Sequence, residues 1–187
     1  SLSNSLYFSM VSSNWVPENL DKTLDEFKKN GVVGIVLDLR NNPGGYLDQA
    51  IEVAKRFVPQ GPIVNLVTRD GKTQTFMSDS EPSPFSLVVL VNGGSASASE
   101  VLAGAIKDRN VGVLVGEQTF GKGMVQRTLS LGALGGIKLT TAYYTTPNGT
   151  NINNTGITPD VVIESDKSNP LKDFITITNP KTLRYGN

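Results

Sequence analysis

Residues 32–45 read VVGIVLDLRNNPGG, and they indicate the class of fold. Residues 32–39 form an almost continuous apolar run rich in Val and Ile, which is typical of a strand buried on both faces. The segment Asn41-Asn42-Pro43-Gly44-Gly45 then breaks the chain sharply. Helical spacing of apolar residues resumes over 47–58. We therefore expect a buried strand, a tight turn and a helix, in that order.

The same alternation continues on both sides of this unit. Apolar spacing predicts helices at 17–29 and 98–107, and Asp70-Gly71 predicts a β-hairpin. Further strands are expected at 6–11, 63–68, 73–77, 87–91, 113–116, 125–129, 137–145 and 161–163. Buried strands that alternate with helices favour a single α/β domain over residues 1–187, with a mainly parallel central sheet flanked by helices.

The composition excludes several classes of function. Seventeen basic and seventeen acidic residues give zero net charge, so nothing favours nucleic acid or an anionic membrane. The longest apolar runs, such as 87–91, are too short for a transmembrane segment. The chain has no histidine and no cysteine, which rules out a Ser-His-Asp triad, a Cys-His dyad and a histidine-bound metal within this polypeptide. An enzyme with a side-chain nucleophile would need lysine or a carboxylate as its base.

Ser97 is the candidate nucleophile. It lies in the run Gly93-Gly94-Ser95-Ala96-Ser97-Ala98-Ser99-Glu100, between a predicted strand and a predicted helix. At the start of a helix, the amide of Ala98 would be available to a developing oxyanion. The alternative is that Ser97, like Ser95 or Ser99, simply caps the helix.

Lys122 is the candidate base. A lysine in a loop is usually a solvated charge, but glycines on both sides of Lys122 let the chain pass close to another element. To act as a base at neutral pH the amine must lose its proton, which burial among neighbours such as Phe120 and Met124 would favour. Gln126 could hold the amine through a hydrogen bond, or be an ordinary surface residue of a strand.

A phosphate-binding loop is a rival interpretation of the same segment. Residues 116–122, GEQTFGK, match the spacing of a P-loop and follow a strand. Gly123 stands where that motif needs Ser or Thr for magnesium, and the next segment is strand-like instead of helical. The nucleotide interpretation is therefore disfavoured.

The turn Asn42-Pro43-Gly44-Gly45 is the third candidate element. It is either a plain tight turn or a source of exposed amides for an oxyanion hole. Asp38 and Arg40, next to the buried strand, are expected to be paired, because buried charges generally are. Glu100 is expected to belong to a structural ion pair on the helix that follows Ser97.

Three segments, in this order, resemble the C-terminal processing peptidases, also called tail-specific proteases. They are residues 37–45 (LDLRNNPGG), 94–100 (GSASASE) and 116–126 (GEQTFGKGMVQ). Residues 146–149 (TPNG) and 156–160 (GITPD) also match, so the similarity spans about residues 6 to 164.

The resemblance implies a crotonase-like protease core and a serine endopeptidase that cuts protein substrates near their C-termini. Carried over by position, Ser97 is the nucleophile, Lys122 the base and Gln126 the residue that orients the lysine. The oxyanion hole is the amide of Ala98 with one from Gly44 or Gly45. The resemblance implies no cofactor and no metal, and its expected partners are the C-termini of protein or peptide substrates.

Members of this family usually carry a PDZ domain before the protease core. The chain starts with Ser1-Leu2-Ser3 at the core's first strand, so we expect a cut inside a longer protein or a member without that module. The family acts outside the cytoplasm, in the bacterial periplasm or cell envelope or in the thylakoid lumen. A lack of cysteine agrees with such a location.

Two other functions remain open at this point. One is a catalytically idle core or pseudo-enzyme that binds extended peptides at a sheet edge by β-augmentation. The other is an acyl-CoA enzyme of the crotonase type on the same fold, which would leave Ser97 and Lys122 without a role.

Overall fold

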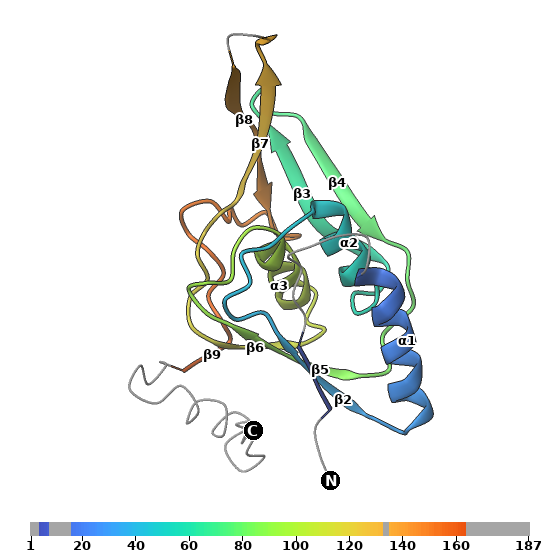
Figure 1. The fold of residues 1–187 in the computed structure, drawn as a ribbon. Helices are drawn as coiled ribbons and strands as arrows, with labels where there is room; N and C mark the ends of the chain where they lie inside the picture. The colour runs from blue at the N-terminus through green and yellow to red at the C-terminus, as the bar shows by residue number, and fades with distance from the viewer. Residues whose placement is uncertain (1–3, 8–15, 133–134, 164–187) are drawn as a thin grey trace.

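A five-stranded parallel sheet forms the base of the molecule (Figure 1). The computed structural model describes residues 4–7, 16–132 and 135–163. Neighbouring strands of this sheet all pair in parallel, as the α/β prediction requires. In spatial order the strands are β1 (Asn4–Tyr7), β2 (Gly34–Asp38), β5 (Ser86–Val91), β6 (Val113–Gly116) and β9 (Val161–Val162).

A second, antiparallel sheet of four strands lies above the first in Figure 1. Its strands, in spatial order, are β4 (Thr73–Ser78), β3 (Gly61–Thr68), β8 (Gly136–Thr145) and β7 (Met124–Ser130). The predicted hairpin at Asp70-Gly71 is confirmed as the connection between β3 and β4. Strands β7 and β8 form a second hairpin that projects from the body of the molecule (Figure 1).

The space between the two sheets is filled by helices. These are α2 (Leu47–Lys55) and α3 (Ala98–Asp108), while α1 (Val16–Lys29) packs against α2 at the side. Helix α3 contacts α2, β3 and β6, and all its residues from 98 to 106 are buried. Small residues dominate this helix, because sheets and helices approach it from several directions: a Cβ added at Gly104 would lie 2.9 Å from the Thr146 side chain. The core of the protein is thus built around α3, the helix that directly follows Ser97.

The prediction that residues 32–39 form a strand buried on both faces is only half right. Ile35 and Leu37 are buried, but Val36 is half-buried and Val33 is 79% exposed. Helices α2 and α3 lie on the same side of the parallel sheet, so alternate side chains of β2 meet different surroundings (Figure 1). For the predicted strand at 6–11, β1 covers only its start, and residues 8–11 lie outside the described part of the chain.

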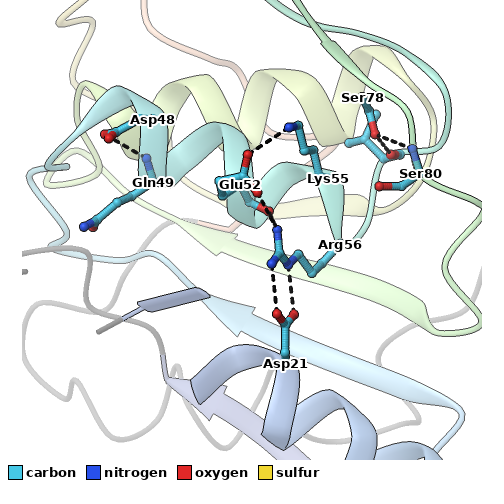
Figure 2. Close-up of polar contacts among 9 residues, drawn as sticks. Asp21, Asp48, Gln49, Glu52, Lys55, Arg56, Ser78 and Ser80 are labelled. Carbon is cyan, nitrogen blue, oxygen red and sulfur yellow. Dashed lines mark hydrogen bonds and ion pairs between the residues drawn. The ribbon is translucent and has the colours of Figure 1, made fainter. Parts of the chain in front are cut away.

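Arg56 joins α1 to α2 at the end of the second helix. Its Nε and Nη2 donate to the two carboxylate oxygens of Asp21 at 2.9 Å each, and its Nη1 donates to Glu52 Oε2 at 2.8 Å (Figure 2). The Arg56 guanidinium lowers the pKa of Asp21 below its usual value. Lys55 first, and then Arg56, lower the pKa of Glu52. The bidentate geometry makes this pair more directional than an ordinary surface ion pair.

Asp21→Asn should therefore destabilise the fold in a pH-dependent way. A depressed carboxyl pKa stabilises the folded state above the ordinary carboxyl pKa, and that stabilisation is lost as the pH falls through the folded value. The pair is partly exposed, so the loss in unfolding free energy at pH 7 should be below about 1 kcal/mol. Urea unfolding at pH 7 and pH 3 measures it, and the difference between variant and wild type should be smaller at pH 3 than at pH 7. Asp25→Asn, on the same helix, is the control, and an equal loss for Asp21→Asn at both pH values would rule out the charge pair as the cause.

Candidate active site

Ser97 occupies a strained turn between β5 and α3. Its φ of 58° and ψ of −117° lie in a region that residues other than glycine rarely adopt, at a cost of about 1–3 kcal/mol. Ser97 is half-buried, whereas Ser95 and Ser99 are fully buried. The Ser95 hydroxyl donates to the carbonyl of Leu39 at 2.7 Å, and the Ser99 hydroxyl donates to that of Asn42 at 3.1 Å. Of the three serines in this run, Ser97 alone combines access to solvent with a helix N-terminus.

The turn that carries Ser97 is fastened to the loop that follows β2. The main-chain N–H of Asn41 donates to Asn92 Oδ1 at 2.8 Å, and Asn92 Nδ2 donates back to Asn41 Oδ1 at 3.1 Å. The N–H of Ala96 donates to the carbonyl of Asn42 at 3.0 Å. Strands β2 and β5 are neighbours in the parallel sheet, so these loops meet at its carboxyl edge, where open α/β sheets place their ligands.

Gly44 and Gly45 differ in what their amides can do. The Gly44 N–H donates to Asn42 Oδ1 at 3.0 Å, and Gly44 is buried. Gly45 is exposed, and within the described chain neither its N–H nor that of Ala98 has a recorded hydrogen-bond partner. Gly44 instead allows its turn to pass close to the start of α3. Its φ is +90°, and an added Cβ would lie 2.7 Å from the Ala98 nitrogen. Of these three amides, only that of Gly44 has a hydrogen-bond partner among the described residues.

Lys122 and Gln126 lie on the segment that leads from β6 into β7. Both residues are exposed, and Phe120 is 65% exposed. The prediction that Lys122 is buried among Phe120 and Met124 is therefore wrong. Among the contacts of the described residues, no hydrogen bond joins the Lys122 amine to the Ser97 hydroxyl or to Gln126. The loop continues into strand β7, so no helix N-terminus follows it, as the argument against a P-loop requires.

Glu100 brings the two candidate segments together through their main chains. Its carboxylate is fully buried on α3 and accepts four hydrogen bonds. Oε2 accepts from the main-chain N–H groups of Ser97 and Lys122, at 2.8 Å each. Oε1 accepts from the Thr119 hydroxyl at 2.6 Å and from the Gly121 N–H at 2.7 Å.

The expected structural ion pair at Glu100 is thus wrong: no basic side chain within the described ranges pairs with it. The physical reason is that main-chain and hydroxyl donors, converging from two segments, compensate the carboxylate without a cation. Sequence reasoning missed this role, although a Glu three residues after a Ser at a helix start is the spacing of a capping box. Thr119 was missed as well, because nothing in its local pattern distinguishes it.

Close packing fixes the glycines on either side of Lys122. A Cβ at Gly121 would lie 3.0 Å from the Gly156 nitrogen, and one at Gly123 would overlap the Asn153 nitrogen.

The predicted pairing of Asp38 with Arg40 is confirmed, with 2.6 Å between Arg40 Nη2 and Asp38 Oδ2.

Two kinds of feature are not found in the part of the chain that the structure covers. No group of three or more potential acidic metal ligands gathers there. None of the helices in the same ranges is long and apolar enough to cross a bilayer.

Comparison with known proteins places the chain among peptidases. The family model of Peptidase family S41 matches residues 7–163. The carboxyl-terminal-processing protease of Synechocystis sp. is 44% identical over 178 residues, which cover 95% of this chain and 40% of that protein. The chloroplastic C-terminal processing peptidase of Tetradesmus obliquus is 45% identical over 143 residues, 75% of this chain and 31% of that protein.

A solved structure agrees with these relatives. The photosystem II D1 C-terminal processing protease matches with a TM-score of 0.83 at 36% identity, over 95% of this chain and 47% of that one. The chain therefore spans less than half the length of these proteins. With a family match over most of its residues, relatives above 40% identity and this shared fold, the chain belongs to Peptidase family S41.

Proposed function

We propose that the chain is the proteolytic core of a serine endopeptidase that cleaves protein substrates near their C-termini, with Ser97 and Lys122 as a catalytic dyad. The observation that carries this proposal is the shared carboxylate of Glu100. One oxygen of Glu100 accepts the main-chain N–H groups of both Ser97 and Lys122 at 2.8 Å. The main chains of the two residues are thereby hydrogen-bonded to one atom, although 25 positions separate them in the sequence.

The reaction uses each group in turn. Ser97 Oγ attacks the substrate carbonyl carbon while the neutral amine of Lys122 takes the hydroxyl proton. The negative charge on the carbonyl oxygen is stabilised by the N–H groups of Ala98 and Gly45, close to the N-terminus of α3. Lys122 then returns the proton to the leaving amine, and water hydrolyses the acyl-enzyme by the reverse sequence of steps.

Because the side chain of Lys122 is exposed, it has to move toward Ser97 before catalysis. Its main-chain N–H is already held by Glu100, and the proposed mechanism requires the side chain to turn so that the amine meets Ser97. A substrate that covers the site would exclude water from around the amine. Gln126, on β7, is proposed to hold the amine in that position.

Substrates and location follow from the relatives only as proposals. Proteins named for C-terminal processing match this chain, so the substrates are proposed to be C-terminal segments of proteins. The location is proposed to be outside the cytoplasm, in the bacterial envelope or a thylakoid lumen. The exposed lysine would also suit a catalytically idle peptide-binding core, so a test has to measure turnover.

Ser97→Ala and Lys122→Arg should each lower turnover by at least about 10³-fold, since each removes one half of the dyad. Arginine keeps the positive charge but stays protonated, so it does not act as a base. The measurement is release of acid-soluble peptides from casein by the full-length protein between pH 6 and 10.

Ser99→Ala is the matched control for the nucleophile. It removes a buried hydroxyl two residues away and should cost stability, roughly 1–3 kcal/mol, while the folded protein keeps its turnover. Substantial activity in Ser97→Ala would refute the nucleophile, and substantial activity in Lys122→Arg would refute the base.

Gly44→Ala should lower kcat by about 10²-fold, because the new Cβ would push the turn that carries Ser97 and Ala98 out of place. That Cβ would lie 2.5 Å from the Ala96 carbonyl oxygen and 3.0 Å from Ser97 Cβ. Gly71→Ala is the control, since Gly71 has a similar φ of +81° and no neighbouring atom within 4 Å. The control should lose about 1–2 kcal/mol of stability but no activity. A folded Gly44→Ala protein with wild-type kcat would contradict the proposed oxyanion site.

A further inference from the structure

The hydroxyl of Thr119 both donates and accepts a hydrogen bond. Thr119 is 4% exposed and lies three residues before Lys122. Its Oγ1–H donates to Glu100 Oε1 at 2.6 Å, and the same oxygen accepts the main-chain N–H of Ile157 at 2.7 Å. The main-chain N–H of Thr119 donates to the Ile157 carbonyl at 3.1 Å. This side chain therefore connects the Glu100 carboxylate to the segment after β8.

The Glu100 carboxylate depends on such donors. It is fully buried, and no cationic side chain among the described residues pairs with it. A buried carboxylate without its hydrogen bonds is strongly destabilised. Loss of the Thr119 hydroxyl would leave Oε1 with the Gly121 N–H as its one remaining recorded donor, so the carboxylate would shift toward other donors or admit water.

The Lys122 loop is anchored to the same segment on its other side. The N–H of Asn154 donates to the Gly121 carbonyl at 2.8 Å, and the N–H of Tyr144 donates to the Gly123 carbonyl at 2.7 Å. The loop is thus held between Glu100 on one side and the end of β8 with residues 152–157 on the other, and Thr119 joins Glu100 to the second of these supports.

We propose that Thr119 is a positioning residue, which acts through Glu100 to hold the main chain of Lys122 at the correct distance from Ser97. The inference rests on the proposed dyad. Because the lysine side chain is exposed, its reach to Ser97 depends on where its main chain is held. A misplacement of about 1 Å in such a group can cost about 10²-fold in rate. A role limited to stability would instead lower the amount of folded protein and leave kcat per folded molecule unchanged.

The test compares three variants of the full-length protein with wild type. Thr119→Val keeps the shape of the side chain and removes the hydroxyl, whereas Thr119→Ser keeps the hydroxyl. Thr158→Val is the matched control, because Thr158 is exposed and its hydroxyl donates only to Gln118 Oε1, at 2.8 Å. The measurements are kcat and KM on a peptide substrate, with the folded fraction determined by circular dichroism.

Thr119→Val should lose about 10- to 100-fold in kcat, with KM within about twofold of wild type. Thr119→Ser should recover kcat to within about threefold, and Thr158→Val should match wild type. A wild-type kcat in folded Thr119→Val, a loss confined to KM, or a failure of serine to restore kcat would each overturn the inference. Ser97→Ala in the same assay separates the two claims: if it is inactive while Thr119→Val is normal, only the positioning role is lost.

A measurement on the wild-type protein covers the case in which Thr119→Val does not fold. If one hydrogen-bonded unit runs from Ile157 through Thr119 to the carboxylate, the amide hydrogens of Ile157, Lys122 and Ser97 should exchange with solvent at similar slow rates. Exchange of the Lys122 amide more than about tenfold faster than that of Ser97 would overturn the inference without any variant.

Discussion

The buried carboxylate of Glu100 is the interaction on which the candidate site depends. It sits on the central helix, without a cationic partner in the described chain, and four donors from two segments compensate its charge. Desolvation of an ionised carboxylate is costly, so the donors and the acceptor hold one another in place. The same bonds that make the buried charge tolerable also fix the main chains of Ser97 and Lys122.

The site therefore combines a rigid main chain with a lysine side chain that remains exposed. Strain at Ser97, the close approach at Gly44 and the packed glycines around Lys122 all occur where the main chain is held from both sides. Strained conformations persist only when their surroundings determine them fully. Under the proposed mechanism, the exposed lysine side chain has to turn toward Ser97 before catalysis.

Most secondary-structure elements could be predicted because their signals are local. Apolar spacing located α2 and α3, and Asp70-Gly71 located the hairpin of β3 and β4. The predicted burial of β2 failed on one face, because a hydrophobic run does not reveal which side of a sheet the helices cover. The ion pair between Arg56 and Asp21 was not foreseen either, since it joins residues 35 positions apart.

For the site, the sequence alone indicated the type of chemistry that is proposed. The lack of histidine and cysteine removed the common triads and dyads, and the motifs around Ser97 and Lys122 supplied a serine and a lysine in the order of a known family. Only the tertiary structure decided that, among the described residues, the Gly44 amide has a partner while that of Gly45 has none, and that Glu100 binds main-chain and hydroxyl donors there instead of a cation. It also decided that Lys122 is exposed. The physical reason is separation along the sequence, because capping and turn signals depend on neighbours only a few residues away. The partners of Glu100 on the lysine segment are 19 to 22 residues distant and meet it only once the sheets and helices have packed.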